Sequence, residues 1–151
     1  MRTVGSELLA AFITDVRDRR VPHPDDLFKP AAKADGGYTL LRGGDSSRGK
    51  SSITEGCASC HGIDGTEIPF DGGEENVGTL SRKKAFEVWA KIVNGHPASP
   101  MGPQPRGDTA QKTRELRDML AALCDRTAYP NGSATTPDVA DGDKRCGADL
   151  E

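Results

Sequence analysis

The segment EGCASCHGID, residues 55–64, holds two cysteines and a histidine within five positions: Cys57, Cys60 and His61. Any fold of this chain must therefore present two thiols and an imidazole from one short stretch of backbone. Three kinds of site use such a stretch: a zinc knuckle, a redox-active dithiol and a covalently attached haem. The rest of the sequence has to distinguish among them.

The zinc and dithiol interpretations find little support elsewhere in the chain. A structural zinc site usually takes four ligands in two pairs, and Cys124 and Cys146 are too far apart to form a second pair. A thioredoxin-type dithiol opens a helix after a buried strand, and no run rich in Val or Ile precedes Cys57. The pattern Cys-x-x-Cys-His is itself the attachment signature of c-type haem.

The composition agrees with a single core that a cofactor completes. Apolar residues make up 34% of the 151 residues and aromatic residues 5%, whereas the chain holds 18 glycines and 10 prolines. Such a chain has little apolar surface with which to offset its conformational entropy. Its helices should also be few and short. A planar apolar cofactor would account for both features.

The charge distribution argues against a nucleic-acid partner, and the hydropathy argues against a membrane-spanning segment. The net charge is −3 and both signs are dispersed, so no basic stripe for nucleic acid is expected. The longest apolar runs, Leu8 to Ile13 and Met119 to Cys124, fall far short of the ~20 residues that cross a bilayer. No transmembrane segment is expected. The first run is also too short for a signal peptide, which predicts a mature or trimmed chain.

Hydrophobic periodicity predicts four helices, at roughly 6–20, 45–57, 81–93 and 108–124. The expected N-caps are Asp45 or Ser46, Ser81 and Asp108, because their side chains can accept hydrogen bonds from free backbone N–H groups. Gly95 is placed to end the third helix. Residues 38–41, YTLL, could form a short strand, and the polar residues 125–151 are expected at the surface.

A ligand for the second face of an iron is offered by Met101, which lies in the Gly- and Pro-rich segment NGHPASPMGP. Together with GGDSSRGKSSITEGCASCHGIDG before it and RELRDMLAAL after it, this segment resembles the class I cytochromes c. The three segments occur in the order of that family and cover about Gly43 to Leu123. Two departures are Ile53, where the family usually has an aromatic residue, and Gly102 after the methionine, where the family often has proline.

The resemblance implies an all-α fold, in which short helices pack around one covalently bound haem c. The expected haem domain is 43–124, preceded by an N-terminal helix and extended segment, 1–42, and followed by a tail, 125–151, tied to the core. Cys57 and Cys60 would form the thioethers, and His61 and Met101 would ligate the iron.

Several other residues have two interpretations. His96 is a rival to Met101 as ligand or an exposed loop residue, and His23 is expected in a solvated turn. Trp89 could contact a haem propionate or pack in the core. Pro69 could orient His61 through its carbonyl group or fix a turn. Cys124 and Cys146 could form a disulfide or stay as thiols.

The function implied is single-electron transfer rather than catalysis, as a soluble carrier or as the cytochrome subunit of a larger redox enzyme. Its partners would be redox proteins, bound transiently or within that complex. The expected location is periplasmic or otherwise extracytoplasmic, because c-type haem is attached outside the reducing cytosol. The alternative is a gas-binding or catalytic cytochrome in which Met101 is a labile ligand. The segments 1–42 and 125–151 could also dock the haem domain onto a partner.

Overall fold

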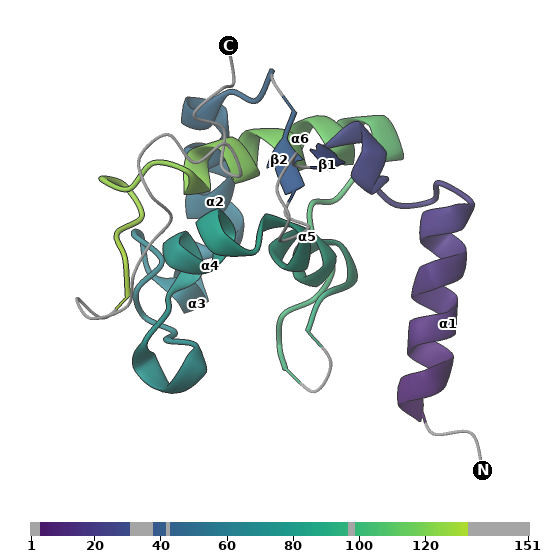
Figure 1. The fold of residues 1–151 in the computed structure, drawn as a ribbon, viewed down its shortest axis with the longest axis horizontal. Helices are drawn as coiled ribbons and strands as arrows, with labels where there is room; N and C mark the ends of the chain where they lie inside the picture. Colours follow the sequence, from purple (N-terminus) through teal and green to yellow (C-terminus); the bar gives the residue numbers. More distant parts are fainter. Residues whose placement is uncertain (1–3, 31–37, 42, 97–98, 133–151) are drawn as a thin grey trace.

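The computed structural model describes residues 4–30, 38–41, 43–96 and 99–132 (Figure 1). The α-helices are α1 (Val4–Arg17), α2 (Ser46–Gly56), α3 (Ala58–His61), α4 (Val77–Lys83), α5 (Ala85–Asn94) and α6 (Thr109–Leu123), and the 3-10 helices are η1 (Pro24–Asp26) and η2 (Asp71–Gly73). The strands β1 (Phe28–Pro30) and β2 (Tyr38–Leu40) pair antiparallel, with Phe28 opposite Leu40. The mostly helical architecture agrees with the all-α prediction, and the short strand at YTLL is confirmed.

The crossing of α2 and α6 organises the core. The backbones of the two helices approach closely at Gly49, because a Cβ atom there would lie 1.9 Å from the Asp118 carbonyl oxygen. Ile53 on α2 is buried, as are Leu116, Met119, Leu120 and Leu123 along α6. The helix predicted at 108–124 is therefore present, and it turns an apolar face to the core.

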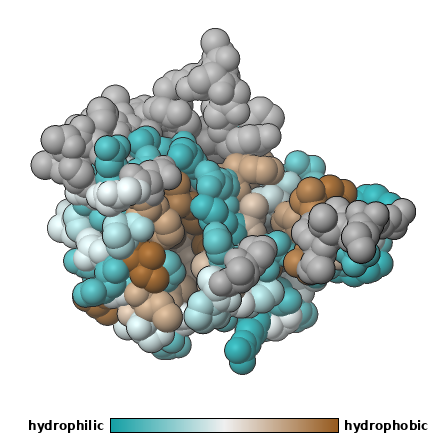
Figure 2. Space-filling model, turned by 90° about the horizontal axis from the view of Figure 1, so that it is seen from below, coloured by the Kyte–Doolittle hydropathy of each residue, from teal (hydrophilic) through white to brown (hydrophobic). Residues whose placement is uncertain are grey.

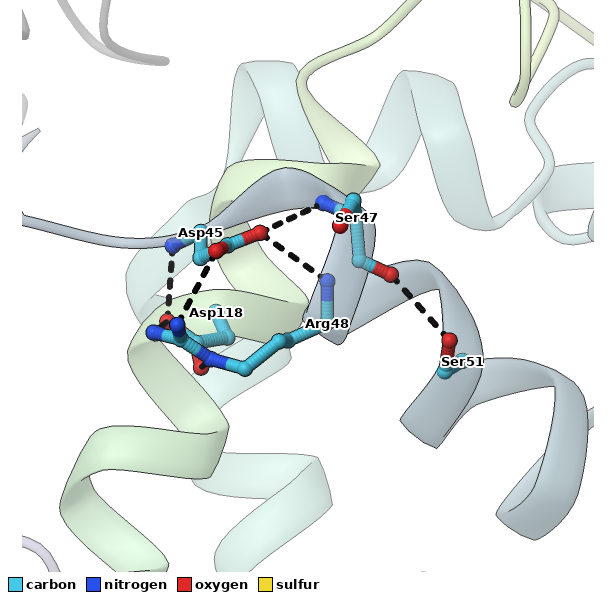
Figure 3. A network of polar contacts seen from close by, with 5 residues as sticks. All are labelled: Asp45, Ser47, Arg48, Ser51 and Asp118. Carbon is cyan, nitrogen blue, oxygen red and sulfur yellow. Dashed lines mark hydrogen bonds and ion pairs between the residues drawn. The ribbon is translucent and has the colours of Figure 1, made fainter.

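A polar network ties the start of α2 to α6 (Figure 3). Asp45 caps α2 by accepting hydrogen bonds from the backbone N–H groups of Ser47 and Arg48, both at 3.0 Å. The Arg48 guanidinium lies between two carboxylates, with Nη1 2.9 Å from Asp45 and Nε 2.9 Å from Asp118. Asp118 also accepts a hydrogen bond of 2.7 Å from the backbone N–H of Asp45. The predicted cap at Asp45 is confirmed, and it is also a tertiary contact.

The third predicted helix is divided in two, and its predicted N-cap is wrong. Ser81 lies inside α4, where it is buried, and Asn76 caps that helix by accepting a hydrogen bond of 3.2 Å from Thr79 N–H. The backbone leaves the helical region at Lys84, with φ −137° and ψ 49°, before α5 begins. The expected glycine cap is confirmed, since Gly95 follows α5 with φ 74°. Asp108 likewise caps α6, accepting a bond of 2.9 Å from Gln111 N–H.

The helix α1 stands apart from the main body, at the right of Figure 1. It contacts the core through Phe12, whose ring centroid lies 5.9 Å from that of Trp89. Leu8, Leu9 and Ile13 remain more than half exposed. The helix ends at Arg17, short of the predicted residue 20, and Arg19 adopts a left-handed conformation with φ 54°.

Of the tail expected at the surface, residues 125–127 are exposed, but Tyr129 returns to the core and is an exception to that expectation. Tyr129 is completely buried, and residues 133–151 lie outside the described part of the chain. Cys124 is disulfide-bonded, whereas its expected partner, Cys146, falls outside the described residues. Within the described ranges, none of the helices has the length and apolarity needed to cross a bilayer.

Candidate cofactor pocket

The cysteine motif lies at the junction of α2 and α3. Cys57 ends α2 with φ −125° and ψ −29°, and the next four residues make the single turn α3, which Gly62 ends with φ 80°. The backbone N–H groups of Cys60 and His61 both donate to the Cys57 carbonyl, at 3.1 and 3.0 Å. Cys57 is half-buried, Cys60 is exposed, and both are free thiols. Local hydrogen bonds therefore hold the three side chains on one turn.

Cys57 and His61 line a pocket with a cavity volume of about 70 Å³. The apolar part of its lining comes from α2, α4, α5 and α6, through Ile53, Leu80, Val88, Ile92, Met119 and Leu123. Phe70 and Tyr129 add aromatic rings. On the side of α3 and of the loop after α5, apolar side chains in tan and brown gather in the main body, bordered by hydrophilic ones (Figure 2). The pocket therefore suits an apolar ligand that can bond to the Cys57 sulfur at its edge.

Met101 lines the same pocket, although it lies 40 positions after His61 in the sequence. Two backbone hydrogen bonds hold the loop that carries Met101 against the end of α5. The His96 N–H donates to the Met101 carbonyl at 2.9 Å, and the Gln104 N–H donates to the Ile92 carbonyl at 2.8 Å. At Gly95 a Cβ atom would lie 2.6 Å from the Met101 carbonyl oxygen, so this approach requires glycine. The structure thus brings Cys57, His61 and Met101 together.

The environment of the pocket sets the charge states of its polar groups. Burial lowers the pKa of His61, which keeps the imidazole neutral and able to ligate a metal. Burial, followed by the charges of Glu115 and Cys60, raises the pKa of Cys57. Reactive dithiols depend on a lowered thiol pKa, so the raised value disfavours a thioredoxin-type function.

The His61 ring is oriented by packing rather than by a hydrogen bond. Phe70 stacks against it with ring centroids 6.3 Å apart and an interplanar angle of 29°. His61 Nδ1 is buried and has no hydrogen-bond partner among the described residues. The expected bond from Nδ1–H to the Pro69 carbonyl is therefore not formed in the structure, where Pro69 is exposed in an irregular segment before Phe70.

The remaining candidates lie outside the pocket lining. Trp89 is 2% exposed, and its indole N–H donates to the Pro22 carbonyl at 3.1 Å. The packing interpretation of Trp89 therefore fits the structure, and the propionate contact does not, because its only donor is engaged. His96 is exposed, and His23 caps η1 by accepting a bond from Asp25 N–H through Nδ1. In the part of the chain that is described, neither histidine lines the pocket.

Of the residues that line the pocket, sequence patterns identify only Cys57, His61 and Met101 as members of a site. Met119 belongs to an apolar run that carries no site motif. Lys91 lies at the pocket with its ammonium group 5.9 Å from the Phe70 ring centroid and 2.7 Å from Glu87. Tyr129 belongs to a polar segment without periodicity, so no sequence signal marked it.

Nothing in the described ranges gathers three or more His, Cys, Asp or Glu side chains as a zinc site would. Comparison of the chain with models of protein families, with curated proteins and with solved structures gives no match.

Proposed function

We propose that this chain is a monohaem c-type cytochrome that transfers single electrons. The observation that carries the proposal is that Met101 lines the same apolar pocket as Cys57 and His61, although it comes from a separate part of the sequence. This is the donor set of a covalently attached haem with His/Met ligation. The proposed fold is that of the class I cytochromes c, with the haem between the α3 turn and the Met101 loop.

The residues present fit such a group. The two thiols lie on one turn, with Cys60 exposed and Cys57 at the pocket, so both are accessible to attachment. His61 is kept neutral by burial, and Met101 offers a soft thioether from a loop fastened to α5. The lining is predominantly aliphatic and aromatic, as expected for a porphyrin site.

When bound, the haem would supply a one-electron Fe(III)/Fe(II) couple. Cys57 and Cys60 would hold the porphyrin by thioethers, while His61 and Met101 would ligate the iron and leave no position for a substrate. The aliphatic side chains of α2, α4, α5 and α6 would exclude water, which tunes the reduction potential. The chain would then act as a soluble carrier or as the cytochrome subunit of a redox enzyme, with redox proteins as partners and an extracytoplasmic location.

Haem attachment can be tested by producing the chain together with a c-type maturation system. A pyridine haemochrome spectrum should then give one haem per chain that remains bound after denaturation. Cys57→Ala combined with Cys60→Ala should abolish this covalent haem. Ser59→Ala is the matched control, because it alters the same turn outside the pocket lining and keeps both cysteines, and it should retain the haem. A colourless wild-type protein from a preparation in which a reference cytochrome matures normally would refute the proposal.

A further inference from the structure

The Tyr129 hydroxyl is a buried polar group that no element of the fold uses. The residue has 0% exposure, and its ring lines the same pocket as His61. Within the described part of the chain, the hydroxyl oxygen has no hydrogen-bond partner. Burial, followed by the nearby Cys57 and Asp125, raises the pKa of Tyr129, so the hydroxyl stays neutral. Buried hydroxyl groups are rarely left unpaired without a functional reason.

The backbone holds Tyr129 in this position from several sides. Its N–H donates to the Asp125 carbonyl at 2.9 Å, and its carbonyl accepts a bond of 2.9 Å from the buried Arg82 guanidinium. A Cβ atom at Gly78 would lie 2.3 Å from the Tyr129 carbonyl oxygen, and one at Gly65 would lie 3.5 Å from its ring. The Tyr129 backbone is thus packed closely against Gly78, where no side chain fits, and this fixes the point from which the ring enters the pocket.

The same pocket contains a second unpaired polar atom, His61 Nδ1. A histidine that ligates a metal through one nitrogen almost always donates a hydrogen bond from the other, which fixes the ring and raises its basicity. Both residues line the same pocket and neither atom has a hydrogen-bond partner among the described residues, so a bond between them requires the rings to move together or one buried water to bridge them.

We propose that the Tyr129 hydroxyl oxygen accepts the hydrogen bond of His61 Nδ1–H, directly or through one buried water, when His61 Nε2 ligates the haem iron. This inference rests on the function proposed above. Tyr129 is then a positioning residue, because it acts on the iron only through His61. By making the imidazole a stronger donor, the bond stabilises the ferric form relative to the ferrous form.

Tyr129→Phe tests the proposal, since it removes the hydroxyl and keeps the ring. In the haem-loaded protein at a fixed ambient potential near the wild-type midpoint, the ferrous-to-ferric ratio should rise about two- to ten-fold, as expected from the loss of one hydrogen bond. The matched control is Ser81→Ala, because the Ser81 hydroxyl is also buried and unpaired among the described residues but does not line the pocket. The control should leave the ratio unchanged.

Proton NMR of the ferrous protein gives a second, independent measurement. In the wild type, His61 Nδ1–H should exchange slowly with solvent and show a nuclear Overhauser effect to the Tyr129 ring or to a bound water beside it. In Tyr129→Phe the exchange should be faster. The wild-type measurement stands even if the variant fails to fold.

Two results would overturn the inference. One is a ferrous-to-ferric ratio in Tyr129→Phe that matches the wild type and Ser81→Ala. The other is a shifted ratio with unchanged exchange of His61 Nδ1–H, which would assign the effect to pocket polarity. Failure of the proposed function is recognised separately, because the wild type itself would then bind no haem or show no reversible couple, and the role of Tyr129 would fall with it.

Discussion

Gly49 on α2 and Asp118 on α6 meet so closely that no side chain fits between the two backbones. A Cβ atom at Gly49 would lie 1.9 Å from the Asp118 carbonyl oxygen and 2.3 Å from its carbonyl carbon. The same Asp118 receives Arg48 and the backbone N–H of Asp45 through its carboxylate. The crossing of α2 and α6 positions Cys57 at the end of α2. It depends on the lack of a side chain at Gly49 and on the buried carboxylate of Asp118.

Gly49→Ala should destabilise the fold by about 1–3 kcal/mol or prevent folding, because the clash is with backbone and cannot be relieved by a change of rotamer. The free energy of unfolding in urea, followed by circular dichroism, measures this effect. Gly56→Ala is the matched control on the same helix, since a Cβ atom there meets nothing within 4 Å. A loss of stability at Gly56 equal to that at Gly49 would contradict the steric explanation.

Met101→Leu should remove the sixth ligand of the haem-loaded protein. The ferric spectrum should lose the weak long-wavelength band of Met-to-iron(III) ligation, and the reduced protein should bind CO tightly. Met119→Leu is the control, because Met119 lines the same pocket from α6 and a swap of similar volume costs less than about 1.5 kcal/mol. It should keep the wild-type spectrum.

The wild-type spectrum also tests the alternative function. A high-spin wild-type protein that binds CO as Met101→Leu does would favour the gas-binding or catalytic cytochrome. A His96→Ala variant that loses the sixth ligand would show that His96 holds that position.

Trp89→Phe should lower the free energy of unfolding by about 1–3 kcal/mol. The substitution leaves the Pro22 carbonyl without its hydrogen-bond donor and replaces a buried indole with a smaller ring. Urea unfolding measures the change. The optical spectrum and the ferrous-to-ferric ratio at fixed potential should stay as in the wild type. A clear change in that ratio would support the propionate contact instead.

The Asp45 carboxylate should make part of the fold's stability sensitive to acid. Backbone hydrogen bonding by Arg48 N–H, with smaller contributions from Ser47 and the Arg48 charge, holds the pKa of Asp45 below its ordinary value. The unfolded chain therefore binds the proton more readily, and stability falls as the pH drops below the unfolded value of about 3.9. Asp45→Asn keeps a capping side chain and should lose less stability than the wild type between about pH 5 and pH 2.

The midpoint of urea unfolding, measured across this pH range, checks the prediction. Asp45→Ala serves as a control that loses the cap at every pH and should be less stable than Asp45→Asn at neutral pH. An Asp45→Asn curve parallel to that of the wild type would show that other carboxylates carry the acid response.

Features that depend on neighbouring residues could be predicted from the sequence. The spacing of Cys57, Cys60 and His61 places them on one turn whatever the rest of the chain does. The caps at Asp45 and Asp108 and the glycine after α5 were also correctly predicted, because each depends on a hydrogen bond or a φ angle within a few positions. Met101 lines the pocket, and its role as an iron ligand stays a prediction.

Features that depend on distant residues could not be predicted. Asn76 rather than Ser81 begins α4, although both are good caps, because Ser81 is buried inside the packed helix. The indole N–H of Trp89 donates to the Pro22 carbonyl, and the Tyr129 backbone approaches α4 closely because residue 78 is glycine. Local spacing determines which groups share a turn or cap a helix. Which of them become buried, paired or left without a partner depends on the packing of segments remote in the chain, and no local pattern encodes it.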